Sequence, residues 1–126
     1  MIYKYEIRPF KMVNNKTCQF YEASVNGKYL YDKFYNNLKN ETVDKKNINS
    51  IIAYMDFYSP YCKLPSTKFN HIQNSSIPNL YEFKKKDIRI YVILKEPSVF
   101  VVLGGYKGRQ KQDIEQVVRL FKDFKI

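Results

Sequence analysis

The stretch from residue 80 to residue 111 constrains the fold more than any other part of the chain. It contains three short runs of β-branched and aromatic residues, separated by the turn-forming segments Lys84-Lys85-Lys86-Asp87 and Lys95-Glu96-Pro97-Ser98. Strands that are joined by such short turns pair with each other in antiparallel order. The sequence therefore predicts a three-stranded antiparallel meander, around which the rest of the chain is organised.

The middle run of this meander alternates with a period of two. Side chains of a strand point to opposite faces in turn, so we expect one apolar face and one face that carries a cation beside a phenol. The third run, residues 99–103, is apolar without alternation, which is typical of an inner strand covered on both faces. The two faces of the middle run are Ile88, Ile90, Val92 and Leu94 on one side and Arg89, Tyr91, Ile93 and Lys95 on the other.

An amphipathic helix is expected between Asp113 and Phe124, where apolar residues recur at three- and four-residue steps. Its apolar stripe should pack across the sheet. The segment between strand and helix, residues 104–111, reads GGYKGRQK. We expect its glycines to let the backbone approach another group closely, and its polar side chains to face a polyanion.

The first 79 residues predict two strands, two helices and a long loop. Strands are expected before Pro9 and from Cys18 to Val25, and helices over residues 29–39 and around the apolar stripe of residues 48–55, ended by Pro60. The two helices should pack as a hairpin over one face of the sheet. Residues 59–79 contain three prolines and several Asn and Ser residues, which indicates a loop, and they include the single histidine, His71.

The motifs of this block resemble those of the RelE/HigB superfamily of type II toxin–antitoxin ribonucleases. The segment Leu80-Tyr81-Glu82-Phe83-Lys84 is similar to a strand motif of that family, and Arg89-Ile90-Tyr91-Val92 is similar to the strand that follows it. The glycine-rich turn and Asp113-Ile114-Glu115 come next in the family's order. The resemblance continues at Phe20-Tyr21-Glu22-Ala23 and covers residues 20–124, which leaves residues 1–19 as an added strand or arm of a single domain, 1–126.

The resemblance implies an α+β fold of RelE type, with an antiparallel sheet, an N-terminal helix pair and a C-terminal helix packed on the sheet. It also implies an endoribonuclease that cuts mRNA on the ribosome and arrests translation. In such a reaction the ribose 2′-hydroxyl attacks the neighbouring phosphorus, so the site needs a base, an acid and cations but no metal or other cofactor. The implied partner is an antitoxin, often of helix-turn-helix type, encoded by an adjacent gene.

On this resemblance the candidate catalytic residues are Lys84, Arg89 and Tyr91. Each has a structural alternative: Arg89 as a solvated cation or a partner of Glu82, Lys84 as a solvated turn residue, and Tyr91 as a packed aromatic residue. Glu82 fits a structural ion pair better than a base. His71 has the side chain best matched to proton transfer near neutrality, but no second histidine or cysteine stands at ligand spacing, so we expect no role or an auxiliary one.

The candidate RNA-binding residues of the glycine-rich turn are Tyr106, Lys107, Arg109 and Lys111, with a solvated loop as the alternative.

Composition agrees with a nucleic-acid partner. The 126 residues include 22 Lys and Arg against 12 acidic residues, a net charge of +10, which favours a polyanionic partner or a basic surface without specific use. No apolar run suggests a membrane segment or signal peptide, so a soluble cytoplasmic protein is expected. Cys18 and Cys62 are too far apart in the sequence to indicate a zinc site or a disulfide scaffold, and both are expected to be free thiols.

Two other classes of function fit parts of the sequence. A catalytically silent RNA- or DNA-binding module could use the same basic face for affinity alone. A purely structural partner protein would need an exposed apolar patch, which the sequence does not locate. RNA cleavage separates the first class from an endoribonuclease, whereas salt-dependent binding does not, because both lose affinity as counterions compete.

Overall fold

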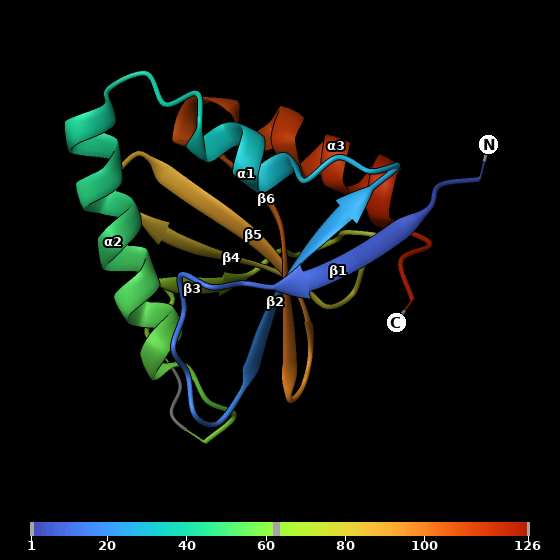
Figure 1. Ribbon diagram of the computed structural model, residues 1–126, viewed down its shortest axis with the longest axis horizontal. Helices are drawn as coiled ribbons and strands as arrows, with labels where there is room; N and C mark the ends of the chain where they lie inside the picture. Colours follow the sequence, from blue (N-terminus) through green and yellow to red (C-terminus); the bar gives the residue numbers. More distant parts are fainter. Residues whose placement is uncertain (1, 62–63, 126) are drawn as a thin grey trace.

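The computed structural model describes residues 2–61 and 64–125 and shows an α+β protein built on one six-stranded sheet. The strand order is β1-β2-β6-β5-β4-β3. Helices lie on both faces of this sheet, and Figure 1 shows α2 to the left of the strands and α3 above them. The predicted α+β class is confirmed.

The predicted meander is present as β4 (Leu80–Lys85), β5 (Ile88–Lys95) and β6 (Ser98–Tyr106). Its strands pair in antiparallel order, from Lys85 opposite Ile88 in the first hairpin to Lys95 opposite Ser98 in the second. Two-residue turns join them, and Lys86 in the first turn has a φ of 51°. A left-handed residue is what a tight hairpin turn requires.

One pairing differs from the expected antiparallel sheet. β2 (Gln19–Val25) lies beside β6 and runs parallel to it, with Phe20 opposite Val99. The two strands are far apart in sequence, and the helices and the meander between them form the crossover that parallel strands need. The strand β6 is therefore an inner strand, as its continuous apolar run predicts.

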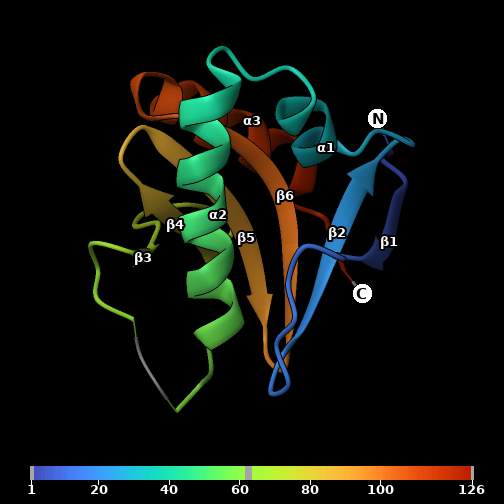
Figure 2. The ribbon, with the colours of Figure 1, turned by 60° about the vertical axis from the view of Figure 1, so that its left-hand side comes forward.

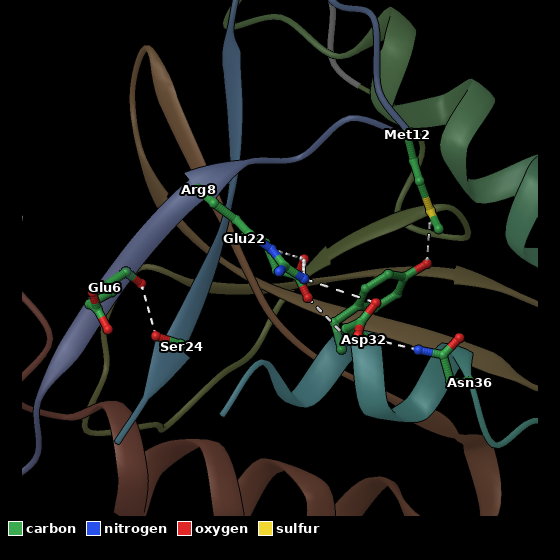
Figure 3. Close-up of polar contacts among 8 residues, drawn as sticks. Glu6, Arg8, Met12, Glu22, Ser24, Asp32 and Asn36 are labelled. Atoms are coloured by element: carbon green, nitrogen blue, oxygen red, sulfur yellow. Dashed lines mark hydrogen bonds and ion pairs between the residues drawn. The ribbon is translucent and has the colours of Figure 1, made fainter. Parts of the chain in front are cut away.

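The N-terminal arm forms an edge strand, β1 (Tyr5–Pro9), antiparallel to β2. Its Arg8 points toward Glu22 of β2 and Asp32 of the first helix (Figure 3), with the Arg8 Nη2 atom 2.9 Å from the Glu22 carboxylate and 3.9 Å from that of Asp32. The same guanidinium lies 3.7 Å above the centre of the Tyr29 ring. These contacts fasten the arm to the strand and helix that follow it.

Two helices cover one face of the sheet, as expected. α1 (Leu30–Tyr35) packs on β6 and β2, and α2 (Glu41–Phe57) packs on β4 and β5. Figure 2 shows α2 crossing in front of the sheet. The side chain of Asn40 caps α2 by accepting a hydrogen bond from the backbone N–H of Val43. The core on this face includes Tyr31, Ile48, Ile51, Met55, Phe83, Ile88, Ile90, Val92, Val99 and Val101.

The opposite face is covered by α3 (Gln110–Phe121), which follows a short 3₁₀ helix, η1 (Lys107–Arg109). Val117 and Phe121 of α3 are buried against Leu80, Tyr91, Ile93 and Phe100. The helix begins earlier and ends earlier than the predicted 113–124. Both faces of the sheet are thus covered in the region of the meander, and neither face of β5 is left to solvent.

Two further expectations need correction. The predicted loop 59–79 contains a short strand, β3 (Phe69–His71), paired with β4, where Phe69 stacks on Tyr81 at a ring-centre distance of 4.9 Å. The expected connecting segment 104–111 is shorter than predicted, because β6 continues through both glycines and leads directly into η1. Cys18 is a free, buried thiol, and the prediction for Cys62 falls outside the described residues.

Within residues 2–61 and 64–125, no helix combines the length and the hydrophobicity needed to cross a bilayer.

Candidate functional site

The strand register brings four of the polar residues singled out in the sequence to one face of the sheet. Glu82 of β4 lies opposite Tyr91 of β5, and Lys84 lies opposite Arg89. Cross-strand partners project from the same face. This set of four residues, called the polar face below, is on the side covered by α3, because Tyr91 belongs to the core beneath that helix.

The polar face is buried more deeply than the sequence suggests. Arg89 is 7% exposed, Glu82 2% and Tyr91 0%, whereas Lys84 is half-buried. The first turn of α3 closes over these residues: the Gln110 side chain donates a 2.7 Å hydrogen bond to Glu82 Oε1. The structural alternative of a solvated Arg89 is therefore wrong, because a helix covers this face as well.

Arg89 is held by contacts within the protein. Its Nη1 donates hydrogen bonds to the backbone carbonyls of Lys86, at 2.7 Å, and Ile88, at 3.0 Å. Its Nε lies 3.7 Å from Glu82 Oε1, which makes the predicted ion pair between the two residues. The guanidinium thus stabilises the left-handed turn residue Lys86 and the buried Glu82 together.

Two hydrogen-bond donors in this cluster lack partners. The Nε atom of Arg89 and the hydroxyl of Tyr91 are buried, and neither has a hydrogen-bond partner among the described residues. Burial raises the pKa of the Tyr91 hydroxyl, and the nearby charges of Asp113 and Glu82 raise it further. Tyr91 therefore stays protonated and can act only as a donor or as a neutral acceptor at neutral pH.

An acidic residue that the sequence analysis did not single out lies beside this face. Asp113, in the first turn of α3, is 9% exposed, and its carboxyl lies against Gly105 of β6. Burial raises the pKa of Asp113, and the positive charge of Arg109 opposes that shift. The sequence carries one signal for this position: Asp113 precedes Val117 and Phe121 at four-residue steps, so it lies on the buried stripe of the helix.

Three exposed cations surround the point where β6 leads into α3. Lys107, Arg109 and Lys111 are all exposed, and the backbone N–H of Lys107 donates to the carbonyl of Asp87 at 2.8 Å. This contact places the turn next to the β4–β5 hairpin, which carries Lys84, Lys85 and Lys86. The structure therefore gathers a basic surface, called the basic end below, from residues 84–86 and 107–111.

Tyr106 is separated from the other predicted RNA-binding residues. It lies opposite Ile88, on the face covered by α2. Its hydroxyl donates to Asp44 Oδ2 at 2.8 Å and accepts from the backbone N–H of Lys39 at 2.9 Å. The structure thus gives Tyr106 a tethering role between β6 and the start of α2.

His71 is also directed away from the polar face. It lies opposite Tyr81, and its neighbour Asn70 is the residue that faces Glu82. Its Nε2 lies 2.6 Å from the carbonyl oxygen of Pro78, and its Nδ1 lies 3.2 Å from the Gln73 side-chain nitrogen. Both ring nitrogens thus have partners within the loop.

The acidic residues of the described chain do not assemble a metal site. No group of three or more His, Cys, Asp or Glu side chains within residues 2–61 and 64–125 is arranged to hold a metal ion. The chemistry available at the polar face, together with Asp113 beside it, is that of cations, a neutral phenol and two carboxyl groups. Such a set can stabilise a phosphoryl group and exchange protons with it.

Comparison with protein-family models, with curated proteins and with solved structures found no match to this chain.

Proposed function

We propose that this chain is a toxin of RelE/HigB type, an endoribonuclease that cuts mRNA on the ribosome and inhibits translation. The observation that carries the proposal is the convergence of Glu82, Lys84, Arg89 and Tyr91 on one face, next to the basic end. RNA cleavage by the 2′-hydroxyl needs cations close to the phosphate and groups that exchange protons. Both kinds of group are present there.

The order of elements supports a fold of RelE type. A strand, two helices, a three-stranded meander and a final helix follow one another from β2 to α3, and β1 and β3 are additions at the two edges of the sheet. This is the order that the motif resemblance implies for residues 20–124. The arm of residues 1–19 supplies one of the added strands.

In the proposed reaction the ribose 2′-oxygen bonds to phosphorus and the 5′-oxygen leaves. Lys84 and Arg89 stabilise the charge on the phosphoryl oxygens, while Lys107, Arg109 and Lys111 bind the strand on either side of the cut. A lysine provides a point charge and an arginine provides a planar fork of donors, so the two are not interchangeable at a phosphate. The proposed inhibitor is an antitoxin that covers the basic end.

A second candidate, a catalytically silent RNA-binding module, is favoured by one observation. Arg89 and Tyr91 are covered by the first turn of α3, whereas the cations of the basic end are exposed. Exposed cations without accessible proton-transfer groups bind RNA but do not cut it. An endoribonuclease produces new RNA ends, whereas a silent binding module does not.

The test is to map new mRNA 5′ ends after the purified protein is added to a bacterial translation extract, with and without ribosomes. The proposal predicts cuts at defined codon positions that require ribosomes and leave 5′-hydroxyl ends. RNA that is bound but uncut would favour the silent module. RNA that is neither bound nor cut would contradict both functions.

A further inference from the structure

The carboxyl group of Asp113 occupies a place in the polar face that a strand side chain would otherwise fill. A Cβ atom placed on Gly105 would lie 2.0 Å from Asp113 Oδ2, far inside normal contact distance. Gly105 is the cross-strand partner of Arg89, which in turn lies opposite Lys84. The glycine thus lets a carboxyl from the helix lie in the same row as two cations of the sheet.

Two neighbouring donors leave this cluster with unused hydrogen-bonding capacity, although Arg89 Nε also lies 3.7 Å from Glu82 Oε1. Arg89 Nε and the Tyr91 hydroxyl are buried without hydrogen-bond partners among the described residues. An unpaired buried donor is destabilising, so native proteins keep few of them. Two such donors close to a buried carboxyl indicate a site that gains partners when a substrate binds.

The charges around Asp113 suit a proton acceptor. Burial raises its pKa and the charge of Arg109 opposes the shift, so the carboxyl is a stronger base than an exposed aspartate. A base whose pKa lies closer to neutrality abstracts a hydroxyl proton more effectively. Its charge interacts with the Tyr91 hydroxyl of β5 and with Arg109 of η1. In the strand register, Arg89 lies opposite Gly105, over which the carboxyl packs, and Lys84 lies opposite Arg89.

We propose that Asp113 is the general base of the RNA cleavage, an inference that rests on the proposed function. Its carboxylate takes the proton of the ribose 2′-hydroxyl as the 2′-oxygen bonds to phosphorus. The bond from phosphorus to the 5′-oxygen breaks, and the departing oxygen takes a proton from solvent water. The products are a 2′,3′-cyclic phosphate and a 5′-hydroxyl end. The substrate approaches from the basic end, where Arg109 is exposed.

The experiment compares the pH dependence of cleavage in the wild-type protein and in Asp113→Asn. Asparagine keeps the shape of the side chain but accepts no proton, so we expect the rate to fall by on the order of 10²-fold or more. We also expect the acidic limb of the wild-type pH–rate profile to disappear. Affinity for a short single-stranded RNA should stay within about twofold, since a base contributes to the transition state rather than to binding.

Two further variants separate a base from a structural residue. Asp113→Glu should retain part of the activity and the acidic limb, while Gly105→Ala, whose Cβ would displace the carboxyl, should lose activity with Asp113 still present. Thermal unfolding checks that each variant is folded. Asp113→Asn with an unchanged rate and acidic limb would overturn this inference alone. A wild-type protein that cuts no RNA on ribosomes would overturn the proposed function, and this inference with it.

Discussion

Burial changes the role that the sequence predicts for Arg89. Strand alternation places it on the face opposite Ile88 and Ile90, and the register confirms this. The alternating pattern of β5 does not predict that a helix covers that face. The covering residues come from a part of the chain more than 20 positions away. The position of Arg89 was therefore predictable from the sequence, whereas its burial was not.

Replacement of Arg89 should destabilise the protein. In Arg89→Met the buried carboxylate of Glu82 loses its cation and two backbone carbonyls lose a donor, so we expect a loss of about 2–4 kcal/mol in the free energy of unfolding. Urea denaturation measures this change. Arg119→Met, at an exposed position of α3, is the matched control and should change stability by less than about 0.5 kcal/mol. Equal effects of the two substitutions would contradict the structural role assigned to Arg89.

The ionised carboxyl of Asp113 should lower the free energy of unfolding at high pH. Because its pKa is raised in the folded protein, the folded state binds the proton more tightly than the unfolded chain does. The free energy of unfolding should therefore fall as pH rises from the ordinary aspartate pKa through the raised value. Asp113→Asn should remove this fall and raise the melting temperature at pH 8, while the exposed control Glu115→Gln should not. A lower melting temperature for Asp113→Asn at pH 8 would contradict this account.

At the scale of elements, the two glycines at the end of β6 do allow the close approach that the sequence predicts. They lie within a strand rather than in the segment between strand and helix, and the groups that approach them are side chains of the protein itself. Phe34 of α1 packs over Gly104 on one face of the sheet, and Asp113 packs over Gly105 on the other. A glycine in a sequence indicates that another group can approach the backbone closely, but it does not identify that group.

Gly104→Ala should loosen the contact between α1 and β6. The added Cβ would lie 2.3 Å from a ring carbon of Phe34, so the ring must move and we expect a loss of about 1–3 kcal/mol in the free energy of unfolding. Gly108→Ala is the control, because nothing lies within 4 Å of its added Cβ. In a Phe34→Val background the cost of Gly104→Ala should shrink. An unchanged cost in that background would show that Phe34 is not the source of the strain.

The elements themselves were predicted with uneven success. β5 follows from the alternation of residues 88–95, β6 from its continuous apolar run, and α3 from helical periodicity, although α3 begins and ends three residues earlier than predicted. The strand β3 was missed because Phe69, Asn70 and His71 stand among prolines and asparagines. Its pairing with β4 and the packing of Phe69 on Tyr81 and Phe83 depend on a distant segment. The parallel pairing of β2 with β6 depends on contacts between distant segments, which no local pattern reports.

At the scale of the whole molecule, the basic end carries six of the 22 Lys and Arg residues of the chain. Replacing Lys107, Arg109 and Lys111 by glutamine should weaken RNA binding and lower the slope of log affinity against log salt by about 2, because each phosphate contact on a single strand contributes about 0.7. Filter binding at several salt concentrations measures this. Replacing three exposed lysines elsewhere, Lys16, Lys28 and Lys33, removes the same charge and should have a smaller effect. Equal effects of the two triple variants would show that only net charge matters.

The central claim is that the polar face and the basic end together form the site of RNA cleavage. The most direct test is ribosome-dependent mRNA cleavage by Lys84→Ala, compared with Lys46→Ala, which removes an exposed lysine from α2 on the other side of the sheet. Lys84 is the cation of the polar face that is reachable without disturbing the buried cluster. We predict that Lys84→Ala cuts at least about tenfold more slowly, while Lys46→Ala cuts at the wild-type rate. Equal rates for the two variants would contradict the assignment of the site.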